Sequence, residues 1–571
     1  MKETGWHLVA EALKTENVKY VFGLPGDPSF YDALNEYPEI TPIQTRHEGP
    51  GVFMAYAYAK LTGEPGVCHG TLGPGVAQMA AGILEAYSAC LPMVIPCPSP
   101  SQLNEGKGAF QENDQLQMLS GMTKWGYRVT RPDRISWAMR RAFSVAANGK
   151  PGPVFIEVPK DVGFAEIDRS NLPKYLRSDR PLRFRPDFDR VKQAADLLMK
   201  SVRPVMVVGG GGISAKAFSE ILELAELLAI PILTTPCGRG IVSEDHPLAV
   251  GLVGLYRTKV GKRLYEEADV LLGLGTRFEE FQSGAWKYYP QNAKYIQVDI
   301  DSFEIGRNWI PDIAIVGDIK LVLRDMVSVV KDRLGKKDHV GSRFDEIKDA
   351  KRRYEAEVDA ECAASKGDLR VKTILRSLNR IFGPKTILVN ENGSLDLWSY
   401  YYPYYRVLDV LGCIAPAEQT CMGFGVGVSI GAKITKPDMN VVCTTGDGAF
   451  QQQMQELATA AQYSAGATWI IFNNFSLGWP KYVWNLLYPG RHVAVDYKVQ
   501  PDFEKVAEAS KCFGARIEKP SEIDDTLKAA LKANKEGTPA VLNCIVRPMD
   551  YNQFFKEFHL LWGATPDSIS A

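Results

Sequence analysis

The 571-residue sequence predicts an α/β protein made of three consecutive α/β domains with parallel sheets. Short apolar segments, each closed by glycine or proline, alternate with helical segments from one end to the other. Near-continuous apolar strands that alternate with helices are typical of parallel sheets buried on both faces. At about 100–200 residues per domain, the length fits three or four domains.

The first domain shows this alternation most clearly. An amphipathic helix is expected over residues 1–14, and further helices over 51–63 and 76–89. The expected strands lie within residues 19–26, 41–45, 64–75, 91–100 and 151–159. Strands of this length separated by helices predict successive βαβ units.

Two polar stretches, residues 166–187 and 335–370, interrupt the pattern and are interpreted as linkers. In the second, acidic and basic residues recur at i, i+4 spacing, which predicts a solvated, charged helix. The predicted domains are residues 1–165, 186–340 and 365–555, with a C-terminal tail at 556–571. The first and third repeat the sequence strand, glycine-rich turn and helix, so variants of one fold are expected.

Composition excludes several classes of protein. The net charge is −1 and no Lys/Arg run reaches five residues, which argues against nucleic-acid binding. No apolar stretch approaches the roughly 18–20 residues of a membrane span, and the N-terminus lacks the features of a signal peptide. The ten cysteines are scattered without a C-x-x-C motif, as expected for reduced thiols in a cytoplasmic protein.

The stretch 440–474 contains the clearest candidate for a functional site. An apolar strand ends at Gly446-Asp447-Gly448, a helix is expected from about Phe450, and a second strand ends at Asn474. Neighbouring parallel strand ends lie about 5 Å apart, so Asp447 and Asn474 can share one ion. Their oxygens, with the carbonyl of Ser476, suit Mg²⁺. An ordinary turn in which Asp447 caps the helix fits the same residues.

The 27-residue spacing from Asp447 to Asn474 resembles the thiamine-diphosphate motif. In that family the Asp, the second Asn and a carbonyl two residues later hold Mg²⁺, which carries the diphosphate. The resemblance implies the thiamine-diphosphate-binding fold in the first and third domains and a Rossmann-like middle domain.

Glu48, in the segment RHEGPGVFMAYA, resembles the glutamate of acetolactate synthases that hydrogen-bonds the aminopyrimidine N1′ of the cofactor. That contact promotes loss of the C2 proton, while the cofactor supplies the chemistry. Glyoxylate carboligase, a relative, has an apolar residue at this position. The alternative for Glu48 alone is a charge that interacts with a helix dipole.

Four further segments, FGLPGDPSF, GTLGPG, ENGS and EQTCMGFG, resemble the same family. There Met422 would bend the cofactor and the Thr420 carbonyl would accept from its 4′-amino group. The expected cofactor-binding residues are Gly26, Pro74, Gly393, Ser394, Thr420, Met422, Gly446, Asp447, Gly448, Ala449, Asn474, Leu477, Gly478 and Trp479.

The middle segment contains a glycine run after a strand, which alone is weak support for a nucleotide site. Its resemblance to acetolactate synthase implies FAD, whereas related oxalyl-CoA decarboxylases bind ADP or CoA there, and other relatives have lost the nucleotide. The candidate nucleotide residues are Gly210, Gly211, Gly254, Arg277, Asp299, Asp301 and Asp318.

Three further segments concern the substrate pocket. Phe110 and Gln111 lie in a loop resembling one that overhangs the acetolactate synthase active site, and Asp27 is either catalytic or a turn residue before Pro28. Trp479-Pro480 replace the usual Met and Val, which predicts a narrower pocket.

The predicted reaction is decarboxylation of a 2-oxo acid, pyruvate by analogy, with carboligation to a second carbonyl acceptor. The alternatives are a CoA-dependent lyase of the 2-hydroxyacyl-CoA or oxalyl-CoA type, a sulfoacetaldehyde acetyltransferase that uses phosphate, and a non-catalytic cofactor-binding remnant. The family's arrangement, in which neighbouring chains share the cofactor, implies a homodimer or homotetramer.

Overall fold

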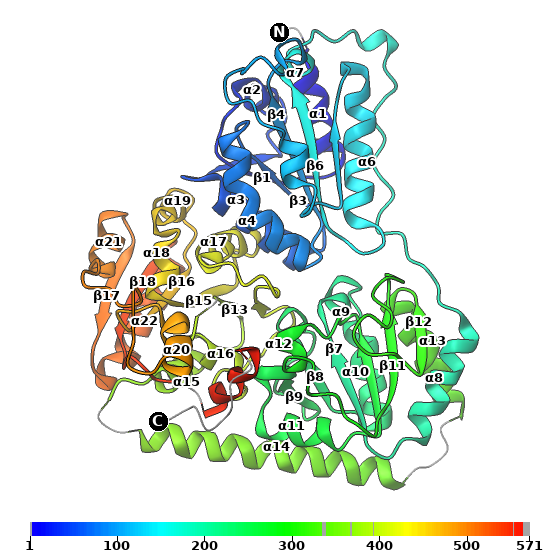
Figure 1. The fold of residues 1–571 in the computed structure, drawn as a ribbon, viewed down its shortest axis with the longest axis vertical. Coiled ribbons are helices and arrows are strands. Elements are labelled where there is room, and N and C mark those ends of the chain that lie inside the picture. The colour runs from blue at the N-terminus through cyan, green and yellow to red at the C-terminus, as the bar shows by residue number, and fades with distance from the viewer. Residues whose placement is uncertain (1–2, 334–337, 366–367, 392, 552, 563–571) are drawn as a thin grey trace. The chain divides into compact units, whose positions relative to one another are not determined.

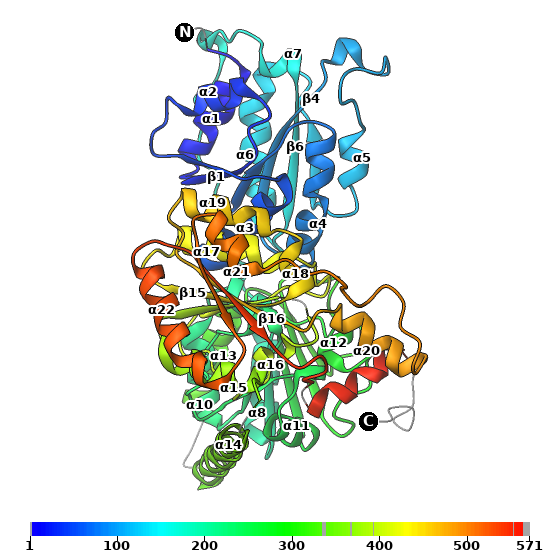
Figure 2. The ribbon, with the colours of Figure 1, turned by 90° about the vertical axis from the view of Figure 1, so that its left-hand side faces the viewer.

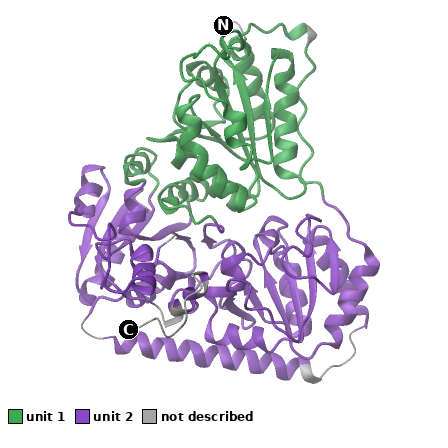
Figure 3. Cartoon of the chain, viewed as in Figure 1, with its two compact units in different colours: residues 1–182, 419–437, 453–465 green, residues 183–418, 438–452, 466–571 purple. Residues whose placement is uncertain are grey.

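The computed structural model describes residues 3–333, 338–365, 368–391, 393–551 and 553–562 (Figures 1 and 2). It contains three six-stranded sheets whose strands all pair in parallel, as the sequence predicts. The chain forms two compact units (Figure 3). Unit 1 comprises residues 1–182, 419–437 and 453–465, and unit 2 comprises the remaining residues.

The first sheet lies in unit 1 and has the strand order β2-β1-β3-β4-β6-β5. Its strands are β1 (Tyr20–Gly23), β2 (Thr41–Gln44), β3 (Gly66–His69), β4 (Met93–Ser99), β5 (Trp125–Arg128) and β6 (Pro153–Pro159). Helix α1 (Gly5–Thr15) packs beside α6 (Ile135–Ala147), and α3 (Glu48–Thr62) packs beside α4 (Pro74–Ser88) (Figures 1 and 2).

The second sheet lies in unit 2 and has the order β12-β11-β10-β7-β8-β9. Its strands are β7 (Pro204–Val208), β8 (Ile232–Thr234), β9 (Ala249–Leu252), β10 (Val270–Leu274), β11 (Lys294–Asp299) and β12 (Ile313–Val316). When β7 to β12 are numbered 1 to 6 and the sheet is read from β9, the order is 3-2-1-4-5-6. This is the order of dinucleotide-binding sheets. The middle region is therefore Rossmann-like, as predicted.

The third sheet, also in unit 2, has the order β14-β13-β15-β16-β18-β17. Its strands are β13 (Thr386–Asn390), β14 (Cys413–Ile414), β15 (Asn440–Gly446), β16 (Thr468–Asn473), β17 (Phe513–Ile517) and β18 (Ala540–Ile545). Counted in the same way, its order is identical to that of the first sheet. The first and third sheets are thus two copies of one topology.

The charged stretch after the second sheet forms α14 (Asp338–Ala364), so a helix is present as predicted. The expectation that this helix is solvated is wrong for one face, because Ile347, Tyr354 and Val358 are buried there. Apolar residues spaced by four and seven positions form one helical stripe, and that stripe packs on the core of unit 2.

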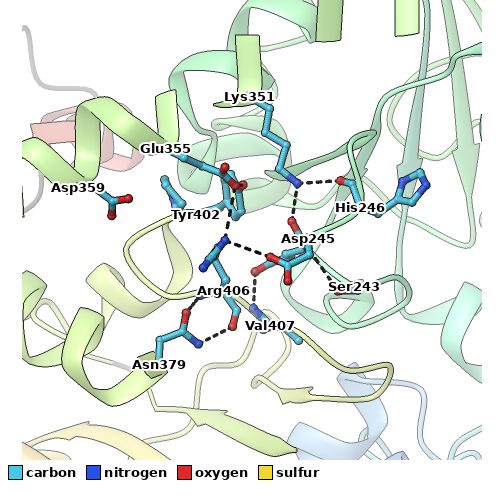
Figure 4. Close-up of polar contacts among 12 residues, drawn as sticks. Ser243, Asp245, His246, Lys351, Glu355, Asp359, Asn379, Tyr402, Arg406 and Val407 are labelled. Carbon is cyan, nitrogen blue, oxygen red and sulfur yellow. Dashed lines mark hydrogen bonds and ion pairs between the residues drawn. The ribbon is translucent and has the colours of Figure 1, made fainter. Parts of the chain in front are cut away.

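A buried lysine anchors the same face of α14 (Figure 4). Lys351 donates through Nζ to the carbonyl oxygens of Glu244 and His246. Burial lowers the pKa of Lys351 to about 8. Near Lys351, Arg406 forms an ion pair with Asp245, and the Tyr402 hydroxyl donates to Glu355. Helix α14 is therefore held by polar as well as apolar contacts.

None of the ten cysteines, all of which the structure describes, forms a disulfide, in agreement with the expected reduced thiols. Among the described residues, no helix combines the length and apolar character that crossing a lipid bilayer requires.

Candidate functional site

The ends of β15 and β16 form the first part of the candidate site, within unit 2. These strands are parallel neighbours, with Gly446 opposite Phe472. Asp447 and Asn474 follow them directly, so both lie at the same sheet edge. The helix begins earlier than predicted: α18 (Asp447–Gln451) starts at Asp447, not near Phe450, because the extended backbone of Gly446 already serves as the N-cap. The Asp447 carboxylate therefore lies at a helix N-terminus, which favours anions.

The Asp447 side chain is buried and held by two described contacts. Oδ1 accepts from the backbone N–H of Gly448 at 2.9 Å, and Oδ2 accepts from Nε2 of Gln500 at 2.6 Å. Burial raises the pKa of Asp447 to about 6, although these hydrogen bonds oppose the shift. A desolvated carboxylate of this kind is stabilised when a divalent cation binds beside it.

Asn474 and Ser476 supply further oxygens next to Asp447. The Oδ1 of Asn474 accepts from the Ser476 N–H at 3.2 Å, and its Nδ2 donates to the Pro548 carbonyl at 3.1 Å. The side chain thus has a fixed orientation. One carboxylate, one amide oxygen and a nearby carbonyl form a hard oxygen set with few protein ligands, which fits Mg²⁺ completed by a diphosphate.

Glycines leave open space at this strand edge. A Cβ atom at Gly446 would meet nothing within 4 Å, and one at Gly393 would have its nearest neighbour at 3.9 Å. A Cβ at Gly478 would lie 2.1 Å from Oγ of Ser394, so these two predicted residues are adjacent. Apart from Trp479, the predicted cofactor-binding residues that lie in unit 2 are Gly393, Ser394, Gly446, Asp447, Gly448, Ala449, Asn474, Leu477 and Gly478.

Glu48 forms the second part of the site, within unit 1. It is the first residue of α3, follows β2 and is 4 % exposed. A Cβ atom at Gly75 would lie 2.8 Å from Oε1 of Glu48, and one at Gly70 would lie 3.1 Å from its Cγ. The GTLGPG turn therefore leaves the space that the glutamate occupies. Pro74 starts the helix that follows this turn.

A second buried glutamate, which the sequence reasoning missed, supports Glu48. The carboxylate of Glu456 accepts from the Arg46 N–H at 2.9 and 3.2 Å and from the Thr459 hydroxyl at 2.6 Å. Burial raises the pKa of Glu456 to about 7. It thus fixes the backbone two residues before Glu48. Its only sequence signal is an acid directly before the mostly apolar segment 457–461.

The predicted aminopyrimidine contacts Thr420 and Met422 also lie in unit 1. Thr420 has a φ of +45°, and the N–H of Cys421 donates to Oε2 of buried Glu85 in α4 at 3.0 Å. Met422 is 40 % exposed, so its side chain is available to a ligand.

Helix α17 (Phe424–Thr435) follows Met422 and packs closely on α3. A Cβ atom at Gly431 would lie 2.5 Å from the Met54 carbonyl oxygen, so only glycine allows this approach. Phe424 contacts Tyr56 edge-to-face at 5.0 Å. Unit 1 therefore brings Glu48, the Gly70–Gly75 turn and the segment 420–422 into one body.

Two predicted substrate residues lie on a loop beside this body. Phe110 is 78 % exposed, and the Gln111 carbonyl would lie 2.4 Å from a Cβ atom at Gly73. Oε1 of Gln115 accepts from the Gly73 N–H at 2.8 Å, which ties the loop to the GTLGPG turn.

Asp27 is buried and caps α2 (Pro28–Leu34), accepting from the Ser29 N–H at 2.9 Å. Burial also raises the pKa of this carboxyl group. This contact supports the turn role of Asp27. A Cβ atom at Gly26 would lie 2.2 Å from the Thr71 Cβ, so the Asp27 loop lies against the GTLGPG turn.

Trp479, at the start of α20 (Gly478–Leu487), belongs to an aromatic cluster in unit 2. Its ring lies edge-on to Phe555 at 5.4 Å and to Phe558 at 5.1 Å, and tilted to Phe281 at 6.4 Å. The C-terminal 3-10 helix (Gln553–Trp562) therefore fixes the position of this residue.

The candidate nucleotide residues lie at or just after the carboxyl ends of strands of the second sheet, and Gly254 begins a 3-10 turn after β9. Several of them already have protein partners. Asp318 pairs with Arg183 at 2.7 Å, Asp299 accepts from the Asp301 N–H at 2.9 Å, and Arg277 pairs with Glu279 at 3.1 Å. Gly211 approaches the Gly275 backbone, which leaves little room there for a side chain.

Comparison with known proteins identifies this arrangement. Models of the thiamine pyrophosphate enzyme N-terminal, central and C-terminal domains match residues 3–118, 191–326 and 391–544. A probable acetolactate synthase large subunit of Methanocaldococcus jannaschii is 37 % identical, over 96 % of this chain and 92 % of its own length. The acetolactate synthase large subunit of Haemophilus influenzae is 31 % identical, over 93 % and 92 %.

The fold and these matches define a thiamine-diphosphate-dependent enzyme. More particularly, the chain belongs to the acetolactate synthase superfamily of these enzymes.

Proposed function

We propose that this enzyme uses thiamine diphosphate and Mg²⁺ to decarboxylate a 2-oxo acid and to join the remaining acyl unit to a second carbonyl compound. Pyruvate is the proposed donor, because the relatives that cover almost the whole chain are named acetolactate synthases. When bound, the cofactor supplies the carbanion that attacks the 2-oxo group and accepts the electrons as CO₂ leaves.

The observation that carries this proposal is the placement of Glu48. A carboxylate that is almost fully buried lies in a space made by Gly70 and Gly75, on a backbone held by Glu456. In the proposed role Glu48 hydrogen-bonds the aminopyrimidine N1′ and thereby controls the proton there. Burial and the short distance to the glycine turn keep water away from that contact.

At the other end of the cofactor, the proposed ligands of Mg²⁺ are the Asp447 carboxylate, Asn474 Oδ1 and the Ser476 carbonyl. Gln500 presently donates to Asp447 Oδ2, so we infer that it orients the carboxylate from outside the metal shell. Ser394 and Gly478, which are adjacent, are proposed to contact the diphosphate.

For the substrates, we propose that Phe110 and Gln111 contact the donor or acceptor from the loop tied to Gly73. Asp27 remains a candidate for catalysis, although its cap contact supports a structural role. Trp479 is proposed to limit the size of the acceptor, because its aromatic neighbours leave the ring little freedom to move.

We further infer that the enzyme acts in the cytoplasm, since none of its ten cysteines forms a disulfide. A homodimer or homotetramer is inferred because the family shares each cofactor between chains. FAD is the proposed ligand of the middle region. The dinucleotide-type strand order supports it.

The test is a substrate screen with thiamine diphosphate and Mg²⁺. It offers pyruvate alone, pyruvate with 2-oxobutyrate or glyoxylate, sulfoacetaldehyde with phosphate, and a 2-hydroxyacyl-CoA. The expected product is a 2-hydroxy-3-oxo acid from pyruvate, with release of CO₂. Turnover of only the phosphate or CoA substrates would make the proposed reaction wrong while leaving the cofactor assignment intact. A visible spectrum of the purified protein tests FAD.

A further inference from the structure

Unit 1 contains a cavity that the proposed reaction does not use. It has a volume of about 240 Å³ and lies at the carboxyl ends of β4, β5 and β6. Open α/β sheets bind ligands at this edge. The loop after β4 closes its other side. The lining residues are Ser99, Pro100, Ser101, Gln102, Glu105, Gly106, Glu112, Asn113, Asp114, Arg128, Glu157 and Pro159.

The cavity wall is strongly acidic, with four carboxylates and a single guanidinium. Two of the carboxylates have structural partners. Glu112 accepts from the N–H groups of Gly106 and Ala109, and Asp114 caps the helix α5 (Gln115–Leu119) by accepting from the Gln117 N–H at 3.0 Å. Glu105 pairs with Nη1 of Arg128 at the rim.

Glu157 differs from these three because its side chain is only 1 % exposed and still borders the cavity. Nε of Arg128 lies 3.2 Å from its Oε2, an ion pair without hydrogen-bond geometry. Within the described part of the chain, neither oxygen of Glu157 accepts a hydrogen bond. A buried carboxylate that has one ion pair and no hydrogen-bond donor keeps unmet acceptor capacity, which costs free energy. A donor that enters the cavity would relieve that cost.

We propose that this cavity binds a small organic cation whose ammonium or guanidinium group donates to Glu157. The excess of carboxylates over Arg128 selects a cation over an anion. The volume corresponds to roughly eight water molecules, which suits a compact alkylammonium ion. Among the described residues there is no group of three or more His, Cys, Asp or Glu placed to hold a metal, which favours an organic cation.

The cavity and the proposed substrate contacts share one loop. Glu112, Asn113 and Asp114 line the cavity, and they directly follow Phe110 and Gln111, the proposed substrate contacts. The hydrogen bonds of Glu112 to Gly106 and Ala109 make this loop one closed unit. A cation beneath it would therefore restrict the loop that carries Phe110. This consequence rests on the proposed function, whereas cation binding itself does not.

The experiment measures binding of n-butylammonium, 1,4-diaminobutane and guanidinium to the full-length protein by calorimetry and by thermal shift. n-Butanol, of similar shape but neutral, is the ligand control. We expect saturable binding of at least one cation and none of n-butanol. Glu157→Gln should weaken that binding by about tenfold to a hundredfold, the value of one charge-assisted hydrogen bond. Asp133→Asn, on the surface of the same unit, is the matched control and should change nothing.

A second variant keeps the test decisive if Glu157→Gln fails to fold. Arg128→Leu removes the competing guanidinium, so the cation should bind more tightly to it than to the parent protein. The proposal is overturned if none of the three cations binds saturably, if Glu157→Gln binds them unchanged, or if Arg128→Leu binds them less tightly. Because these are binding measurements, they stand whether or not pyruvate proves to be the substrate.

Discussion

The first and third sheets have the same strand order, yet their equivalent turns carry different chemistry. After the third strand of the third sheet, the turn carries Asp447 at the start of a helix. After the third strand of the first sheet, the equivalent turn carries glycines, and the carboxylate that fills its space, Glu48, comes from the connection after the second strand. The shared topology thus provides the same sheet edge twice, and a few residues set the proposed roles, a metal site in the third sheet and a positioned acid in the first.

Replacing Glu48 with Gln tests the role of the first sheet. We expect a loss in kcat of about 10²–10⁴-fold, the range for a positioned acid–base group, with cofactor affinity nearly unchanged. Steady-state kinetics and calorimetric titration with thiamine diphosphate measure the two quantities. Glu36→Gln, on the surface of unit 1, is the matched control. A variant that keeps full activity would show that Glu48 is a helix-end charge only.

Replacing Asp447 with Ala tests the role of the third sheet and should give the opposite pattern. Removal of a metal ligand is expected to weaken cofactor binding by more than about a hundredfold, since even outer-shell changes cost 10–100-fold. Gln500→Ala should have a smaller effect on the same titration, because it holds only one oxygen of Asp447. If Asp447→Ala bound the cofactor normally, the aspartate would be only a charge in the first turn of α18, and the third sheet would not have the proposed metal-binding role.

Gly75→Ala tests whether the glycine turn serves Glu48. The new Cβ atom would lie 2.8 Å from Oε1 of Glu48, so the carboxylate must move. A displacement of this size is expected to lower kcat by about tenfold to a hundredfold without unfolding the protein. Gly121→Ala is the control, because a Cβ there would meet nothing within 4 Å. If the two variants were equally active, the glycine turn would not be needed to position Glu48, the proposed catalytic glutamate.

The sequence was sufficient for features that depend on local pattern. The alternation of apolar strands and helices predicted three parallel sheets, and the spacing of Asp447 and Asn474 predicted adjacent strand ends. Contacts between distant segments could not be predicted from the sequence. Nothing in the segment around Gln500 indicates that this amide donates to Asp447, because chain reversals over 53 residues decide that contact.

Burial was equally difficult to predict when a residue's pattern had two interpretations. The charges of α14 predicted a solvated helix, but its apolar stripe and the carbonyl partners of Lys351 bury one face. Trp479 was expected to contact the cofactor and to narrow the pocket, and the residues that fix its ring, Phe281, Phe555 and Phe558, come from two distant segments.

The smallest effect is expected for the substitution Glu456→Gln, and it concerns the pH dependence of stability. Its folded-state pKa of about 7 lies above the ordinary value of 4.5, because burial disfavours the carboxylate. The folded protein therefore holds this proton more tightly than the unfolded chain. The stabilisation is complete below pH 4.5 and is lost as pH rises from 4.5 to 7, by up to about 3 kcal/mol. Glu456→Gln, which stays neutral, should lack this part of the pH dependence.

The measurement is the apparent thermal midpoint of parent and variant from pH 5 to pH 8. The difference between the two proteins should change in favour of Glu456→Gln as pH rises toward 7 and then level off. Glu518→Gln, an exposed acid, controls for general titration of surface carboxylates. Parallel curves for parent and variant would contradict the raised pKa of Glu456. They would mean that the hydrogen bonds from Arg46 and Thr459 compensate the burial of Glu456 in full. Glu456 would then hold the backbone before Glu48 as a carboxylate at all these pH values.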